Sequence, residues 1–160
     1  MNLVTSLLIT LAMALPETAA DTAARRKALN DLLAEQWDYT LARNPELASV
    51  LGDKRGNDRL NDLSQAAVAE DLAQARDFLR RFEEIDTAGF PEQEVLNKSL
   101  MVRDLRQGLE DARFRGWLMP VTQVGGPHLN LPEIVSVLTF GTAKDYRDYI
   151  ARLRQVPKAL

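Results

Sequence analysis

Apolar residues recur at every third or fourth position through most of this chain, and that spacing limits the folds open to it. Because an α-helix has 3.6 residues per turn, residues spaced in this way fall along one helix face. Residues 23–42 and 91–113 both show the spacing. It is clearest in residues 64–85, where the apolar positions are Val68, Leu72, Ala75, Phe78, Leu79, Phe82 and Ile85. The sequence therefore predicts an all-α fold.

Helix boundaries are predicted from capping residues and helix breakers. Asn44-Pro45-Glu46 ends the first helix and restarts a short second one, because Asn is a favoured N-cap and Pro suits the first helical position. After a polar loop at 53–62, Ser64 is the predicted cap of the third helix. Gly89-Phe90-Pro91 separates the third helix from the fourth. So short a link between two long helices predicts an antiparallel helical hairpin.

The pattern changes near residue 116. Residues 116–124 lack a helical period, which predicts one extended segment, and Gly125-Gly126-Pro127-His128 predicts a tight Gly-rich turn. A short helix is expected from Asn130 to about Phe140. The run 142–145 resembles a capping box, with Asp in place of the usual Glu. It would start a last helix with the apolar stripe Tyr146, Tyr149, Ile150 and Leu153.

Little chain follows this last stripe to cover it. We therefore expect some apolar surface to remain bare, and the isolated chain to self-associate or to bind a hydrophobic dye. On this basis residues 21–160 are expected to be part of a larger helical fold.

Composition narrows the function classes. The length of 160 residues suits one domain, and a hydrophobic content of 46% suits a packed core. The formal net charge of −3 lacks the basic excess of nucleic-acid-binding domains, so no nucleic-acid partner is expected. The absence of cysteine excludes disulfides, thiolate metal sites and a cysteine nucleophile.

The first twenty residues have the layout of a secretory signal peptide. Residues 3–15 form an uncharged apolar core that is too short for a stable membrane anchor, and Thr18-Ala19-Ala20 supplies small residues for cleavage. Met1-Asn2 carries no Lys or Arg, so a buried amino-terminal helix is the alternative. The expected location is periplasmic or secreted.

Complete catalytic sites are not evident in the residues themselves. His128 is the only histidine, and a zinc site needs three or four protein ligands, so no metal site or resident cofactor is expected in this chain. No serine stands in a Gly-x-Ser-x-Gly setting. The acidic pairs Glu83-Glu84 and Glu110-Asp111 are expected on solvated helix faces, because adjacent residues on a helix point in different directions.

One group of residues remains as a candidate site. Two glycines, the single histidine and an asparagine lie close together between apolar elements, and glycine lets a ligand or another backbone approach closely. The predicted cleft-lining residues are Gly125, Gly126, His128 and Asn130.

The order of short motifs along the chain resembles a known bacterial family, domain of unknown function 885. The early motifs are Trp37-Asp38-Tyr39, Asn44-Pro45-Glu46, Leu51-Gly52-Asp53, Asp58-Arg59-Leu60 and Leu63-Ser64. The later motifs are Gly116-Trp117-Leu118-Met119-Pro120, Gln123, Gly125-Gly126-Pro127-His128, Leu131-Pro132, Tyr146-Arg147-Asp148-Tyr149 and Arg152-Leu153. The resemblance covers about residue 32 to the end.

The resemblance implies a long helical protein, often exported, that looks like a zinc-dependent peptidase. The metal motif of that family, a His-Glu pair followed by Pro-Gly-His, is expected far downstream and is absent from these 160 residues. The chain is then an amino-terminal fragment that is inactive alone. Its partner is the missing carboxy-terminal part of the same polypeptide, and zinc and a peptide substrate belong to the full-length form. The alternative is a small exported helical binding module without catalytic activity.

Overall fold

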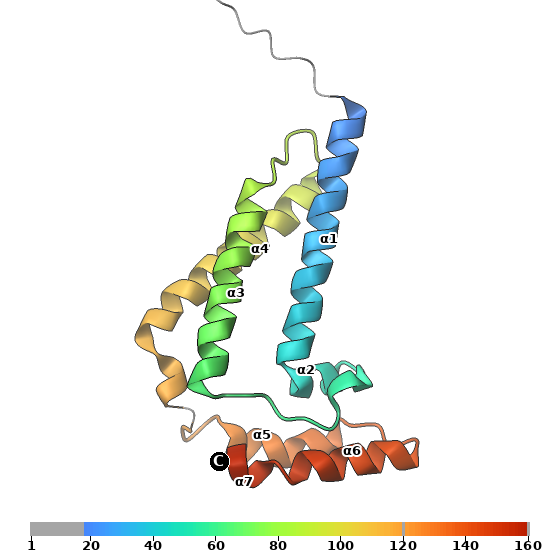
Figure 1. The fold of residues 1–160 in the computed structure, drawn as a ribbon, viewed down its shortest axis with the longest axis vertical. Coiled ribbons are helices and arrows are strands. Elements are labelled where there is room, and N and C mark those ends of the chain that lie inside the picture. Colours follow the sequence, from blue (N-terminus) through green and yellow to red (C-terminus); the bar gives the residue numbers. More distant parts are fainter. Residues whose placement is uncertain (1–17, 120, 160) are drawn as a thin grey trace, which may run out of the picture.

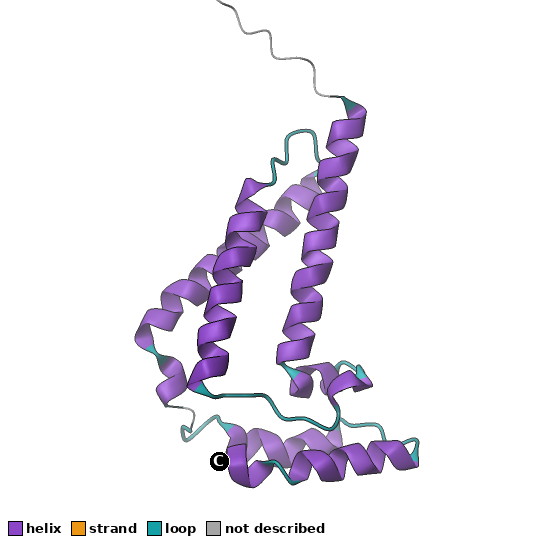
Figure 2. Cartoon of the chain, viewed as in Figure 1, coloured by secondary structure: helices purple, strands orange, loops and turns teal. Residues whose placement is uncertain are grey.

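The computed structural model describes residues 18–119 and 121–159, and these residues form helices and connecting turns with no β-strand among them (Figure 2). The all-α prediction is confirmed. The long helices are α1 (Ala19–Arg43), α3 (Gln65–Glu84) and α4 (Glu92–Asp111). The shorter α-helices are α2 (Pro45–Val50), α5 (Pro127–Glu133), α6 (Ala143–Leu153) and α7 (Val156–Ala159). The 3-10 turns are η1 (Lys54–Gly56), η2 (Ala112–Phe114), η3 (Gly116–Leu118) and η4 (Ile134–Ser136).

The three long helices form the body of the molecule, and α4 runs back along α3 after the short link between them (Figure 1). Their apolar stripes meet in a core of Leu29, Leu32, Phe78 and Phe82. Burying each such side chain contributes about 1.5–3 kcal/mol. Helix α4 has no fully buried residue of its own, and its half-buried Met101, Val102 and Leu105 close the core from that side.

Ion pairs also join the long helices. The Arg26 guanidinium forms a bidentate pair with Glu94, which links α1 to α4, and Arg81 pairs with Glu35, which links α3 to α1. These pairs are partly exposed, so each adds little stability compared with the apolar core.

Helices α5, α6 and α7 form a carboxy-terminal layer that lies across the last turn of α1 and the first turn of α3 (Figure 1). Two separate stretches of the chain lie at this end of the molecule. The first is α2 with η1, and the second is α5 to α7. The two passages meet at α6, which is where the candidate site lies.

Several predicted boundaries are confirmed. The Ser64 hydroxyl accepts the amide hydrogen of Ala67 and so caps α3, and Pro45 occupies the first turn of α2. The capping box of α6 is complete, since Thr142 and Asp145 each accept a hydrogen bond from the other's backbone amide. Among the described residues, no helix has the length and apolarity to cross a membrane.

The region 112–136 differs from the prediction. Part of the expected extended segment is folded into the 3-10 turn η3, which is separated from η2 by Arg115 with a left-handed φ of 51°. The tight turn lies earlier than expected, because the Thr122 amide donates to the Gly125 carbonyl at 2.8 Å. Helix α5 begins at Pro127, a residue whose fixed φ favours the first helical position, so His128 and Asn130 lie in a helix and not in the turn.

The predicted signal peptide lies largely outside the described residues, which begin at Thr18. Thr18 is the N-cap of α1, and its hydroxyl accepts the amide hydrogen of Asp21 at 3.2 Å. The predicted cleavage region, Thr18-Ala19-Ala20, therefore coincides with the start of α1.

Candidate functional site

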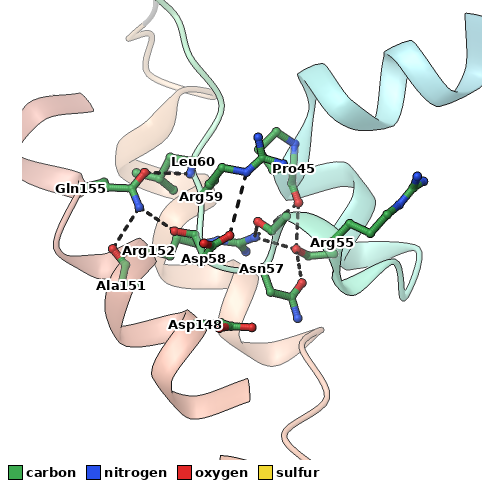
Figure 3. A network of polar contacts seen from close by, with 12 residues as sticks. Pro45, Arg55, Asn57, Asp58, Arg59, Leu60, Asp148, Ala151, Arg152 and Gln155 are labelled. Carbon is green, nitrogen blue, oxygen red and sulfur yellow. Dashed lines mark hydrogen bonds and ion pairs between the residues drawn. The ribbon is translucent and has the colours of Figure 1, made fainter. Parts of the chain in front are cut away.

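The most unusual residue of the molecule is Arg152 on α6, whose side chain is fully buried with 1% of its surface exposed. Its Nη2 donates to the Ser49 hydroxyl at 2.6 Å, to the Gly56 carbonyl at 2.8 Å and, more weakly, to the Pro45 carbonyl at 3.4 Å. All three acceptors come from α2 and η1 (Figure 3). Arg152 therefore joins the two passages of the chain through this end of the molecule.

Ser49 is the centre of this cluster of polar contacts. It is buried, and its hydroxyl lies 2.8 Å from the Pro45 carbonyl and 2.7 Å from Asn57 Oδ1. The hydroxyl has one hydrogen, which it donates to one of these oxygens, while its lone pairs accept from Arg152. Asn57 is also buried, so the cluster replaces water contacts with protein contacts at α2, η1 and α6.

Arg152 has no carboxylate within ion-pair distance among the described residues. Its Nε and Nη1 are buried and have no hydrogen-bond partner there. Burial lowers the pKa of Arg152, and the more distant carboxylates of Glu46 and Asp58 oppose that shift. Because an arginine side chain keeps its charge in proteins, this group cannot act as a general base. It can hold backbone carbonyls in place.

A second buried charged residue, Asp145, also joins α6 to η1. Asp145 accepts from Lys54 of η1 at 2.8 Å and from the amides of Gly141 and Thr142. The hydrogen bond from Lys54 lowers the pKa of Asp145 well below its usual range, and the bonds from Thr142 and Gly141 add to the effect. The carboxylate is thus ionised throughout the physiological pH range.

Gln155 completes the contacts between the loop after η1 and the end of α6. Its Nε2 donates to the Asp58 carbonyl at 2.6 Å, and its Oε1 accepts from the Leu60 amide at 3.4 Å (Figure 3). These bonds satisfy backbone groups in a loop that forms no regular structure.

The orientation of α6 follows from these contacts. Its buried residues are the charged Asp145 and Arg152, whereas three of its apolar residues are exposed, with exposed fractions of 57% for Tyr146, 47% for Ile150 and 44% for Leu153. Tyr149 is half-buried against Phe140, with ring centroids 5.5 Å apart. The expected bare apolar surface is present on this helix. An amphipathic helix with its apolar side outward offers a surface for binding.

The residues predicted to line a cleft are only partly brought together. Gly125 forms the turn with Thr122, and Gly126 follows it with a φ of 137°. His128 is exposed on α5, and Asn130 lies two residues further along the same helix. Their assignment to a substrate cleft stays a prediction.

A shallow, open hollow lies elsewhere, along one side of α4. Its volume is about 550 Å³, and it is lined by Ser99, Val102, Arg103, Arg106, Gln107 and Glu110. The acidic pairs face solvent and bind separate arginines, since Glu83 pairs with Arg106 and Glu110 with Arg113. Neither pair brings two carboxylates together for acid and base catalysis. Among residues 18–119 and 121–159, no three acidic or histidine side chains are grouped as metal ligands.

The sequence also matches a described family, the bacterial proteins of unknown function DUF885, over residues 45–160. The chain belongs to this family. The match begins at Pro45, inside the Asn44-Pro45-Glu46 motif, and includes every motif after that one on which the resemblance rests. Neither a curated protein nor a solved structure matches the chain significantly.

Arg152 and the residues it is linked to form what we call the Arg152 cluster: Pro45, Ser49, Gly56, Asn57 and Arg152. All of them lie within the part of the chain that matches DUF885. The sequence contains the residues of this cluster but gives no sign of their contacts. Arg152 and Asp145 lie on the polar side of a strongly amphipathic helix, and the polar side of such a helix is normally exposed.

Proposed function

We propose that this DUF885 chain is the amino-terminal helical region of a metallopeptidase-like hydrolase and that it is inactive by itself. The single observation behind this is the orientation of α6, which buries Asp145 and Arg152 and turns Tyr146, Ile150 and Leu153 outward. Such a face is suited to packing against further helices. The peptidase class comes from the family resemblance.

In this proposal the carboxy-terminal layer forms one wall of a substrate cleft. Helix α5 belongs to that layer and carries the exposed His128 beside the Gly125–Gly126 turn. The zinc ligands and the general base come from a His-Glu and Pro-Gly-His segment elsewhere in the same polypeptide, because a zinc-bound water needs about three protein ligands to hold the metal. The substrate is a peptide.

The test begins with the genomic DNA that follows the Leu160 codon. We expect the reading frame to continue into a His-Glu and Pro-Gly-His segment. The product of that longer frame should cleave a fluorogenic peptide library, lose activity with a chelator and regain it with zinc, while the 160-residue chain should be inactive.

A stop codon directly after Leu160, together with a monomeric product that melts in one sharp transition, would contradict the proposal. It would favour the small exported helical binding module instead.

Export is a separate part of the proposal. We propose that residues 1–20 are removed during secretion to the periplasm or medium, on the strength of the uncharged core at 3–15. Mass spectrometry of the native protein should give a mature start near Asp21. A cytoplasmic protein that retains Met1 would contradict export without affecting the hydrolase proposal.

A further inference from the structure

The exposed stripe of α6 has the spacing of a helix-pairing seam. Tyr146, Ile150 and Leu153 are separated by four and then three residues, which is the d, a, d order of a heptad. They expose 57%, 47% and 44% of their surfaces respectively. At about 1.5 Å of rise per residue, the seam is about 10 Å long, or two helical turns.

Two arginines flank this seam on one side. Arg147 and Arg154 each follow a d position directly, so both occupy e positions seven residues apart. Both are exposed, and neither side chain makes a hydrogen bond or an ion pair with the part of the chain that the structure describes. In paired helices, charged residues at e meet opposite charges at the edge of the partner's seam.

We propose that α6 binds one amphipathic helix whose apolar stripe is flanked by acidic residues about seven positions apart. The partner's apolar residues would cover Tyr146, Ile150 and Leu153, and its carboxylates would pair with Arg147 and Arg154. The inference concerns the chemistry of the partner and holds whether or not the hydrolase proposal is correct.

A second copy of α6 fits this surface less well. Antiparallel pairing of two copies would place e positions opposite e positions, so Arg147 and Arg154 would face arginines. Parallel pairing would place them opposite g positions, and the g position within α6, Tyr149, carries no negative charge. The partner's acidic residues must therefore come from a different helix.

An anionic membrane fits less well too. A helix that lies in a membrane interface carries cations along its polar face. Here the side of α6 opposite the seam is buried against α2 and η1, and Lys144 is paired with Asp148. Only one flank of the seam is basic.

The test uses a fluorescein-labelled peptide of about three heptads with Leu at a and d and Glu at e and g, since repulsion between its glutamates disfavours self-pairing. A matched peptide carries Lys in place of Glu. Anisotropy titrations with the 160-residue chain should show binding of the acidic peptide, with an affinity about tenfold or more above that of the basic one.

Variants of the chain test whether the peptide binds at the seam of α6. The double variant Arg147→Glu with Arg154→Glu should invert the preference between the two peptides, and Ile150→Ser should weaken binding of both. Arg76→Glu, an exposed arginine on α3, is the matched control and should leave the preference unchanged. Thermal melts by circular dichroism verify that each variant is folded.

Several results would overturn the inference. These are equal binding of the two peptides, no binding of the acidic peptide, or a double variant with the preference of the wild type. Binding to vesicles of phosphatidylglycerol without binding of the acidic peptide would assign the seam to a membrane instead.

Discussion

Arg152 Nη2 donates a hydrogen bond to the Ser49 hydroxyl at 2.6 Å, across 103 positions of sequence. With the bond to the Gly56 carbonyl, it fixes which side of α6 faces α2 and η1. Polar contacts, and not burial of the apolar stripe, therefore orient this helix. As a consequence, its apolar stripe is left for a partner.

Replacing Arg152 should destabilise the junction. Arg152→Ala leaves the Gly56 carbonyl buried without its donor and opens a cavity, so we expect a loss of about 3 kcal/mol in the free energy of unfolding. Arg154→Ala, an exposed neighbour, should change it by less than about 0.5 kcal/mol. Urea unfolding followed by circular dichroism measures both.

The coupling between Arg152 and Ser49 can be measured directly. In a double-mutant cycle with Ser49→Ala, the two effects should be non-additive by about 1 kcal/mol or more, because the groups share a hydrogen bond. Additive effects, or equal unfolding midpoints for Arg152→Ala and Arg154→Ala, would show that Arg152 does not join these elements.

Two glycines should respond in opposite directions to replacement by alanine. At Gly56 a Cβ atom would lie 2.6 Å from the Pro45 Cβ, so Gly56→Ala must shift the rigid proline or η1 and should cost about 1–3 kcal/mol. At Gly108 in α4, the added Cβ would meet no heavy atom within 4 Å apart from the adjoining backbone of its own helix and its two chain neighbours, and Gly108→Ala should stabilise by about 0.5–1 kcal/mol. Thermal melts of the two variants provide the comparison. A stabilised Gly56→Ala would refute the packing of η1 on α2.

The low pKa of Asp145 predicts an acid-dependent loss of stability. The hydrogen bond from Lys54 favours the ionised carboxylate in the folded state, so this stabilisation is complete above the unfolded pKa of about 3.9 and is lost as the pH falls toward the lower folded pKa. Asp145→Asn should lower the melting temperature at pH 7 and should flatten its decline below about pH 4. Asp104→Asn, an exposed control on α4, should retain the wild-type decline.

The pH dependence of stability that Tyr39 on α1 contributes has the opposite sign. Burial raises the pKa of Tyr39 to about 12, and its hydrogen bond to Asp71 contributes to the shift. The folded state thus holds this proton more tightly, so the stability it contributes is present below pH 10.0 and falls as the pH rises toward 12. Tyr39→Phe should remove that part of the decline, whereas the exposed Tyr146→Phe should not. A wild-type slope in Tyr39→Phe would contradict the assignment.

Local signals predicted the helices because those signals act within a few residues. Ser64 and Thr142 cap α3 and α6 as expected, and Pro45 starts α2. The region 116–124 is harder to predict because 3-10 turns have no long period, and η3 begins there directly after the left-handed Arg115.

The Arg152 cluster was beyond prediction for a different reason. Its acceptors lie 96, 103 and 107 residues away, and no local pattern encodes such separations. Hydrophobic periodicity places Tyr146, Ile150 and Leu153 on one side of α6 and Arg152 on the opposite, polar side, which normally faces water. The structure has the reverse, because three polar acceptors on α2 and η1 meet the guanidinium.

The orientation of α6 can be tested most directly by thiol accessibility. The chain has no cysteine, so Ile150→Cys and Leu32→Cys each introduce a single thiol, on the exposed face of α6 and in the core respectively. Reaction with a thiol reagent under native conditions should be nearly as fast for Ile150→Cys as for the same protein in urea, and should be strongly slowed for Leu32→Cys. Equal protection of the two thiols would contradict an outward-facing apolar stripe on α6.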